Sequence, residues 1–296
     1  MPTFEITPRG PFSLAAAQRF AGGFPAGIGG GSAEGSIVMS FPVEGSDSSA
    51  AVELHQEASG VVIGNTDADP GDLPMVARQA ARSLSLDHDG SGWPAVGERD
   101  RVIGRFQRAY DYLRPVCFYS AYEAATSFVI GQRISMRQSA RVKARLREVA
   151  GDRPTVDGGA YPAFPRPAQL LALREIPGIS QHKTTWLRGI AQAARDGRLQ
   201  SEALRAMPRD EALAALQELP GIGPWTAEAI RLRGCGMVDE LPSQDEMTPR
   251  AVAALYGGDP LDAPAFQRLA DGWRPYRMWA VVLLRFSSNR ETPLEP

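Results

Sequence analysis

The stretch Leu219-Pro-Gly-Ile-Gly-Pro-Trp-Thr-Ala227 separates two segments, 209–217 and 224–234, in which apolar residues recur at helical spacing. Pro224 suits the first turn of the second helix, because proline has a helical φ and its missing N–H would have no partner there. A Pro-Gly-x-Gly string can also be an ordinary tight turn between helices. The complete string in a helical context favours a dedicated hairpin that joins the two helices.

The hairpin is suited to contact with a phosphate. We expect Gly221 and Gly223 to adopt backbone conformations closed to other residues and to keep side chains away, so that N–H groups approach the anion directly. The positive end of the next helix would face the same anion. Such contacts position a protein on a nucleic acid without reading its bases. The expected phosphate-binding residues are Leu219, Gly221, Ile222, Gly223 and Thr226.

Outside the hairpin, the chain from about Val102 onward has apolar residues three and four apart and no strand signals. Gly- and Pro-rich breaks separate the helical segments. Besides the two around the hairpin, helices are expected at 102–112, 121–131, 135–149, 167–173, 181–196, 248–256, 262–271 and 275–286. Glu175-Ile-Pro-Gly-Ile-Ser180 resembles Glu218-Leu-Pro-Gly-Ile-Gly223, but only the second string keeps both glycines.

The first ninety residues have a different pattern. Short β-rich runs bounded by Gly, Ser or Pro predict strands at 3–7, 36–43, 51–55 and 60–63, with helices at 12–20 and 73–84. The chain is longer than a usual single core, so two domains are expected. The predicted fold class is α+β, with a small β-rich N-terminal domain (1–92) followed by an all-helical core domain (93–296).

Composition excludes several classes of protein. No apolar run approaches the ~20 residues of a membrane span, and the N-terminus lacks the features of a secretory signal, so a cytoplasmic location is expected. Cys117 and Cys235 are too few for a disulfide framework, a four-cysteine zinc site or an iron–sulfur cluster. We expect two free thiols, no metal site and no cofactor.

The net charge of −2 is unevenly distributed. Residues 1–100 hold 5 Arg and 13 Asp or Glu, a net of −8, whereas residues 101–296 have a net charge of +6. Residues 101–150 alone contribute +7. This basic run is either a solvated helix face or a surface for a polyanion, and the sequence alone leaves both interpretations open.

The hairpin string, Tyr122-Glu-Ala-Ala-Thr-Ser-Phe-Val-Ile-Gly-Gln-Arg-Ile-Ser135 and Trp273-Arg-Pro-Tyr-Arg-Met-Trp-Ala280 together resemble the helix-hairpin-helix DNA glycosylases. Within that superfamily the chain is most similar to the bacterial 3-methyladenine DNA glycosylase II branch, over most of its length. Pro11-Phe-Ser-Leu and the strand-rich start resemble the β-domain of this branch. The resemblance implies a monomeric enzyme of base excision repair that acts on damaged double-stranded DNA. In relatives the hairpin carbonyls can also hold a monovalent cation.

The resemblance also indicates the catalytic carboxylate. The family has an aspartate 22 residues beyond the second hairpin glycine, which is Asp245 here, and Leu241-Pro-Ser-Gln-Asp-Glu-Met-Thr248 is similar to the family string apart from Glu246 and Met247. A carboxylate in a water-poor cleft can stabilise the oxocarbenium character that develops when an N-glycosidic bond breaks. Asp239, Glu240 and Glu246 are nearby competitors, and an aspartate before a helix is ordinarily an N-cap.

Members that also cut the DNA backbone have a lysine two residues after the second hairpin glycine, where this chain has Trp225. The only lysines, Lys143 and Lys183, are distant in sequence, so the amine nucleophile of a Schiff base is missing. The resemblance therefore implies a monofunctional glycosylase that hydrolyses the N-glycosidic bond of alkylated purines.

The wedge and the base pocket match the family less well. Gln132 and Arg133 occupy the loop that fills the gap left by a flipped base, and Arg133 could stack between bases or simply contact a phosphate. The expected pocket residues are Trp225, Arg285, Phe286, Trp279 and Phe12. Arg285 replaces an aromatic residue and would disfavour a cationic base. Two alternatives therefore stay open, a glycosylase for deaminated or oxidised bases and a non-catalytic lesion-sensing protein.

Overall fold

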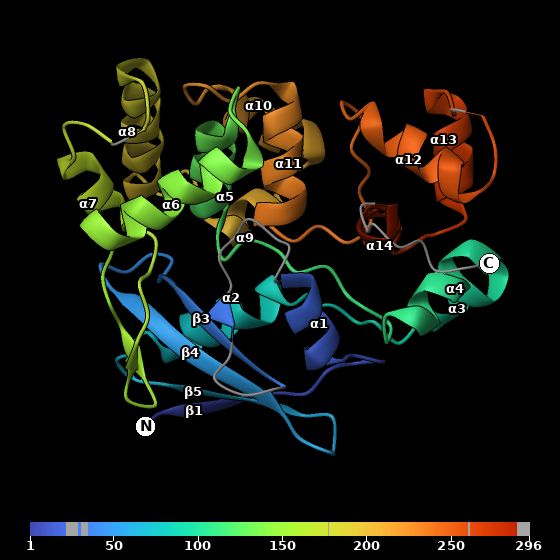
Figure 1. Cartoon of the computed structure of the whole chain (residues 1–296), viewed down its shortest axis with the longest axis horizontal. Helices are drawn as coiled ribbons and strands as arrows, with labels where there is room; N and C mark the ends of the chain where they lie inside the picture. The colour runs from blue at the N-terminus through green and yellow to red at the C-terminus, as the bar shows by residue number, and fades with distance from the viewer. Residues whose placement is uncertain (22–28, 31–34, 177, 260, 289–296) are drawn as a thin grey trace.

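The computed structural model describes residues 1–21, 29–30, 35–176, 178–259 and 261–288, and it places a β-sheet beneath a layer of helices (Figure 1). The sheet is antiparallel and five-stranded, in the order β1-β5-β4-β3-β2. Its strands are β1 (Thr3–Ile6), β2 (Gly29–Gly30), β3 (Ser36–Pro42), β4 (Ser49–Gln56) and β5 (Val62–Thr66). Two helices pack against the sheet: α1 (Leu14–Ala21), between β1 and β2 in the chain, and α2 (Leu73–Ser83), after β5. The predicted β-rich start of the chain is thus confirmed.

The remaining helices form the upper layer and the right-hand side of the molecule in Figure 1. They are α3 (Trp93–Arg99), α4 (Arg101–Ala109), α5 (Ala121–Gly131), α6 (Met136–Ala150), α7 (Pro167–Ala172), α8 (Gln181–Arg195), α9 (Ser201–Ala206), α10 (Arg209–Gln217), α11 (Pro224–Gly234), α12 (Met247–Leu255), α13 (Ala263–Asp271) and α14 (Arg277–Ser288). The sequence did not predict α3 and α9, which are only two turns long or less and therefore leave little periodicity to detect. In the described part of the chain, no helix has both the length and the apolar character needed to cross a membrane.

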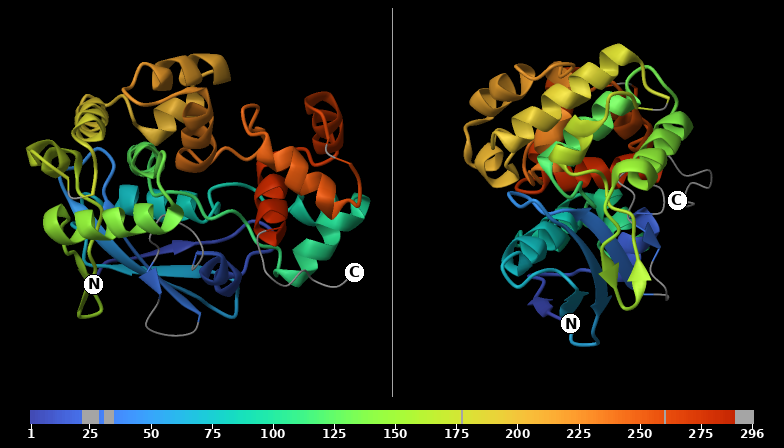
Figure 2. Two further views of the ribbon diagram at one scale, coloured as in Figure 1. Left: turned by 45° about the horizontal axis from the view of Figure 1, so that its top comes forward. Right: turned by 90° about the vertical axis from the view of Figure 1, so that its left-hand side faces the viewer.

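A small hairpin in the helical region corrects the expectation that no strand lies beyond Val102. Strands β6 (Thr155–Val156) and β7 (Gly159–Ala160) extend away from the helices, alongside the sheet (Figures 1 and 2). Asp157 and Gly158 between them both have positive φ, +47° and +73°, which is the geometry of a tight Asp-Gly hairpin turn. The missed signal was this dipeptide, since two-residue strands show no alternation.

The β6–β7 hairpin covers one face of the sheet. Val38 and Ala51 on that face pack against Val156, and Ser40 donates a 2.8 Å hydrogen bond to the carbonyl oxygen of Tyr161. The opposite face, with the fully buried Ile37, packs against α1 and α2. The sheet is therefore covered by α1 and α2 on one side and in part by the β6–β7 hairpin on the other.

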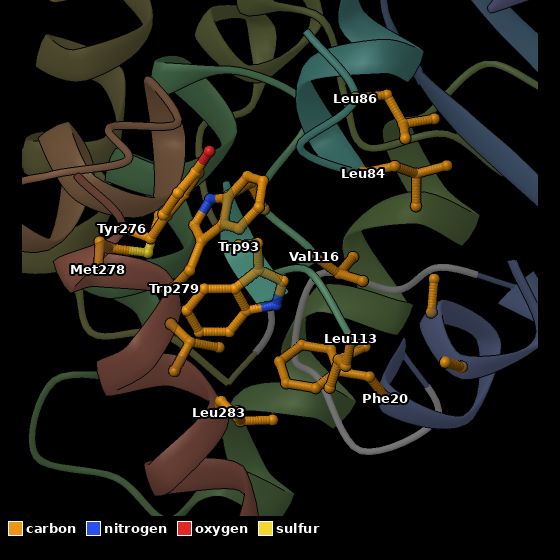
Figure 3. Packing of buried hydrophobic residues seen from close by; sticks show 14 of the residues in the cluster. Phe20, Leu84, Leu86, Trp93, Leu113, Val116, Tyr276, Met278, Trp279 and Leu283 are labelled. Carbon is orange, nitrogen blue, oxygen red and sulfur yellow. The ribbon is translucent and has the colours of Figure 1, made fainter. Parts of the chain in front are cut away.

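One buried core runs across the boundary expected at residue 92. It joins Ile37 of the sheet and Leu84 to Trp93 of α3 and Trp279 of α14. The two indole rings meet edge to face at 5.8 Å, as Figure 3 shows. A second core unites α5, α6, α8 and α11. The fold is therefore two helical groups with separate cores, one of which is continuous with the sheet.

Both cysteines are buried and free, as the sequence predicted. Burial raises the pKa of Cys117, and it raises the pKa of Cys235 to about 12. Neither thiol is suited to act as a nucleophile, because the thiolate is the reactive form.

Candidate active site

A cavity of about 620 Å³ lies between the two helical groups, with α1 on one side. Its wall combines aromatic and aliphatic side chains with a few charged groups, which is the usual make-up of a small-molecule site. The lining residues are Arg19, Phe20, Phe118, Phe128, Met136, Trp225, Glu228, Ala229, Leu232, Arg233, Pro242, Asp245, Thr248, Met278, Val281, Val282, Arg285 and Phe286.

Asp245 is half-buried in this wall, directly before α12. Its Oδ1 atom accepts a 3.0 Å hydrogen bond from the backbone N–H of Met247, and its Oδ2 atom accepts a 2.6 Å bond from the Thr248 hydroxyl. The carboxylate therefore stabilises the first turn of α12 and also lines the cavity. The N-cap residue of α12 is Glu246, so Asp245 is not the N-cap; it supports the first turn from one residue earlier while it lines the cavity.

The competing carboxylates are engaged elsewhere or lie outside the wall. Asp239 pairs with Arg274 and Arg277, each at 2.9 Å. Glu240 accepts from Arg231 at 2.8 Å and does not line the cavity. Glu246 is exposed and also lies outside the lining. Among the residues that line the cavity, only Asp245 and Glu228 have carboxylates.

Glu228 is a cavity residue that sequence reasoning missed. Its side chain is 4% exposed and accepts hydrogen bonds of 2.9 Å from the backbone N–H groups of Ser243 and Gln244. It also accepts from the Ser243 hydroxyl and pairs with Arg209 at 2.5 Å. A signal was available, since Glu228 is three residues after Trp225 and so lies on the same face of α11.

The hairpin between α10 and α11 has the predicted form, but its two glycines have different roles. Gly221 has a φ of +79°, and a Cβ atom there would lie 2.6 Å from the Trp186 ring. Gly223 has a φ of −92°, which any residue adopts, and a Cβ there would meet nothing within 4 Å. The expected conformational reason for Gly223 is therefore wrong. Its lack of a side chain keeps the outer surface of the hairpin open.

The other hairpin residues present backbone rather than side chains. Leu219 and Ile222 are buried in the second core, and Thr226 is buried in the first turn of α11. The first N–H groups of a helix have no partner within the helix, so the start of α11 can receive an anion. The assignment of these residues to phosphate binding remains a prediction.

The loop between α5 and α6 is tied to the hairpin. The Gln132 side-chain amide donates a 2.8 Å hydrogen bond to the Gly221 carbonyl oxygen. Lys183 of α8 donates from Nζ to the carbonyl oxygens of Ile130, at 3.1 Å, and of Gln132. Arg133, next in the chain, is exposed and has a positive φ of +56°. Gln132 thus anchors the loop to the hairpin, and the exposed Arg133 lies next to this anchor. The wedge role of both residues remains a prediction.

Three of the five predicted pocket residues line the cavity, namely Trp225, Arg285 and Phe286. Trp225 is 47% exposed and meets Phe128 edge to face at 5.6 Å. Phe286 packs against Phe20, with 4.9 Å between ring centroids. These rings form a wall against which a planar base could stack.

Trp279 and Phe12 are corrections, because neither lines the cavity. Trp279 is fully buried beside Trp93 and Tyr276 (Figure 3), and the Arg114 guanidinium lies 5.1 Å from its ring. Packing explains this placement: Trp279 lies against Trp93 and Tyr276 in the first core, whereas Phe286, on the same side of α14 two turns further along, reaches the cavity. Phe12 packs at the edge of the first core, and Phe20 takes its expected place. Phe118, Phe128, Met136 and Met278 were also missed.

No lysine lines the cavity, which matters for the type of reaction. Lys143 is buried in α6, where burial lowers its pKa to about 8. Lys183 is occupied by the carbonyl groups at the end of α5. The cationic groups of the wall are arginines, among them Arg285, which donates a 3.3 Å hydrogen bond to the Met247 carbonyl oxygen.

The chain is similar in sequence and fold to known DNA glycosylases. The chain is 29% identical over 194 residues to DNA-3-methyladenine glycosylase 2 of Escherichia coli K12, covering 64% of this chain and 65% of that protein, slightly less than two thirds of its length. The 3-methyladenine DNA glycosylase of Archaeoglobus fulgidus superposes with a TM-score of 0.77 at 21% identity, over 97% of both chains. The chain is a homologue of the E. coli glycosylase and has the helix-hairpin-helix glycosylase fold.

A more distant structural neighbour is named for a second activity. The 8-oxoguanine glycosylase/lyase of Clostridium acetobutylicum, in complex with double-stranded DNA, superposes with a TM-score of 0.62 at 17% identity, over 85% of this chain and 83% of that one. No family model matches the chain. The fold therefore includes both glycosylases and glycosylase/lyases, and the site residues must distinguish them.

Proposed function

We propose that this protein is a DNA glycosylase that hydrolyses the N-glycosidic bond of alkylated purines in duplex DNA, the first step of base excision repair. The observation that carries the proposal is the position of Asp245, whose carboxylate lies in the wall of an aromatic cavity next to the hairpin helix α11. The E. coli and A. fulgidus relatives are named for 3-methyladenine. Both similarities support an alkylated base as the substrate.

The proposed mechanism uses the charge of Asp245. As the glycosidic bond breaks, positive charge develops on the sugar, and a fixed carboxylate stabilises it without having to reorganise. The Met247 N–H and the Thr248 hydroxyl fix the orientation of the carboxylate in advance. The same group can then orient the water that adds to the sugar.

We propose that the enzyme is monofunctional and leaves an abasic site. Backbone cleavage by a Schiff base needs an amine nucleophile in the cavity. The position that carries this lysine in bifunctional members is Trp225, and the two lysines of the chain are engaged away from the cavity wall. Hydrolysis is the reaction that the residues of this wall support.

The proposed DNA contacts divide into a clamp and a wedge. The open surface at Gly223 and the start of α11 would hold a phosphate, whereas Arg133 would fill the space left by the flipped nucleotide. Gln132 connects the two, because its amide is bonded to the hairpin carbonyl of Gly221. We propose that one monomer binds the damaged duplex through both elements.

The test is to incubate the protein with a duplex that contains a single 7-methylguanine and to measure released base, abasic sites and strand breaks separately. Release of the base with abasic sites and no enzymatic strand break is the expected result. Tight binding without release would favour a lesion-sensing protein. Strand breaks together with a covalent enzyme–DNA adduct after borohydride reduction would show a lyase. Release of the base only from duplexes with hypoxanthine or 8-oxoguanine would show that the substrate is a deaminated or oxidised base.

A further inference from the structure

The loop that carries Asp245 has little backbone support of its own. Among the described residues, no backbone N–H of residues 241–245 donates to a backbone carbonyl group. The N–H groups of Ser243 and Gln244 donate instead to Oε2 of Glu228, both at 2.9 Å. A single side chain on α11 therefore accepts both hydrogen bonds, from residues two and one positions before Asp245.

Glu228 is itself held in place by a buried ionic network. Arg209 of α10 contacts Glu228 at 2.5 Å and Glu240 at 3.1 Å, and Arg231 contacts Glu240 at 2.8 Å. Arg231 also donates to the carbonyl oxygens of Leu204 and Met207. The network thus holds Glu228 in place, and Arg209 adds a 3.3 Å hydrogen bond of its own to the carbonyl oxygen of Leu241 at the start of the loop. Glu228 is the group that holds the N–H groups of Ser243 and Gln244.

We propose that Glu228 is a positioning residue for excision, which holds the loop before Asp245 so that the Asp245 carboxylate faces the cavity. This inference rests on the proposed function of Asp245. Glu228 lines the same cavity, but its oxygens are directed to loop N–H groups and to Arg209, and so it acts on the reaction through Asp245. A carboxylate suits this task because its two oxygens accept several hydrogen bonds at once.

A network of buried charges could equally be structural, so the effect on the catalytic step must be separated from stability. Glu123 provides a matched control, since it is a fully buried carboxylate that pairs with Arg147 at 3.3 Å, away from the cavity. Glu228→Met and Glu123→Met both remove a buried carboxylate together with its contact to an arginine. Arg209 is 30% exposed and can turn toward water, which favours folding of the Glu228→Met variant.

Three measurements test the proposal on the full chain: the single-turnover rate of excision from a 7-methylguanine duplex, the Kd for a duplex with an abasic analogue, and amide hydrogen exchange at Ser243 and Gln244. For Glu228→Met we expect the excision rate to fall by about 10- to 100-fold, because the transition state is stabilised less. The Kd for the duplex should be almost unchanged. Exchange at both amides should accelerate. Glu228→Gln keeps an acceptor oxygen for the loop and should stay within about threefold of the parent rate. For Glu123→Met, the excision rate and the exchange rates of both amides should stay at the parent values.

A Glu228→Met rate close to that of the parent, or equal rate losses in Glu228→Met and Glu123→Met, would overturn the proposal. If Glu228→Met does not fold, Ser243→Ala removes one of the same hydrogen bonds from an exposed residue. It should slow excision by about two- to fivefold and leave the Tm unchanged, and an unchanged rate would refute the role. A parent protein with no excision refutes the proposed function instead, and the exchange measurements then still decide whether Glu228 holds the loop.

Discussion

The Thr248 hydroxyl lies 2.6 Å from Oδ2 of Asp245, so a residue in the first turn of α12 also orients the carboxylate in the cavity wall. The second oxygen of Asp245 accepts from the Met247 N–H at 3.0 Å. An asparagine could satisfy both contacts, with its oxygen on the N–H and its amide on the Thr248 oxygen. The geometry of this site can thus be kept while its charge is removed.

Asp245→Asn is therefore expected to fold, to bind a damaged duplex at least as well as the parent, and to lose nearly all excision. Preorganised electrostatic groups commonly contribute about two to three powers of ten in rate, and binding should not suffer because an anion near the DNA backbone is removed. Single-turnover excision and duplex Kd measure the two effects. Glu246→Gln is the control, because Glu246 is exposed and outside the cavity. A loss of less than about threefold in Asp245→Asn would contradict the catalytic role.

The two hairpin glycines should separate stability from binding. Gly221→Ala places a Cβ against Trp186 at a positive φ that side chains rarely adopt. We expect the free energy of unfolding to fall by about 1–3 kcal/mol and the Tm to fall by several degrees. Gly223→Val meets open space and should fold normally, but it should weaken binding to damaged and undamaged duplex alike, because the clamp contacts phosphate. Normal DNA binding by a folded Gly223→Val variant would disprove the clamp.

Arg133→Ala should slow excision more than it weakens nonspecific binding, by about tenfold against about twofold, because a wedge offsets the cost of unstacking the flipped nucleotide. Arg137→Ala, an exposed neighbour on α6, is the matched control and should affect only the salt-dependent part of binding. Equal behaviour of the two variants would assign Arg133 to phosphate contact.

Arg285→Leu should change the substrate preference. The guanidinium lies in the cavity wall beside the Met247 carbonyl, where it repels a base that carries positive charge. We expect the rate ratio between cationic 7-methylguanine and neutral hypoxanthine to rise by about tenfold in Arg285→Leu. Arg19→Gln provides a comparison, since Arg19 also lines the cavity but pairs with Asp111 at 2.6 Å. An unchanged ratio would show that Arg285 does not contact the base.

Stability should depend on pH through Glu123. Burial raises the pKa of this carboxyl to about 7, against 4.5 for an ordinary glutamate. The folded state binds the proton more tightly than the unfolded state, so this stabilisation is complete below about pH 4.5 and is lost as the pH rises through about 7. Urea unfolding of the parent between about pH 5 and 7 should therefore show a loss of stability that Glu123→Gln lacks. Parallel curves for the two proteins would contradict this pKa.

The sequence predicted the parts of the site that are local in the chain. The hairpin and Asp245 are set by short strings and fixed spacing; the structure has a hairpin between α10 and α11, and Asp245 lines the cavity. Their roles in DNA binding and catalysis remain predictions. It could not show which face of α14 meets the cavity, because packing against Trp93 decides that Trp279 is turned away. Phe20 replaced Phe12 in the wall for the same reason, since the position of α1 depends on the sheet beneath it.

Glu228 shows a further limit. Its role depends on the loop at Ser243 and Gln244, fifteen and sixteen residues further along the chain, and a hydrogen bond across that distance leaves no periodic trace. Gly223 shows a different limit, because the conformational reason expected for this glycine is wrong while its phosphate-binding role remains a prediction. Its ordinary φ could not be known before the hairpin geometry was seen.

The core that joins the sheet to α14 has a consequence for biosynthesis. Leu14 and Leu284 belong to the same buried cluster, although they lie near opposite ends of the chain. A ribosome releases the N-terminal part first, so the portion of this core that packs against α14, such as Trp93, stays uncovered until α14 emerges. Nascent chains in that interval expose surface that associates readily, and chaperones bind such surface. Docking of α14 onto this core, rather than folding of the β-rich start, is thus the step that removes the exposed apolar surface of the nascent chain.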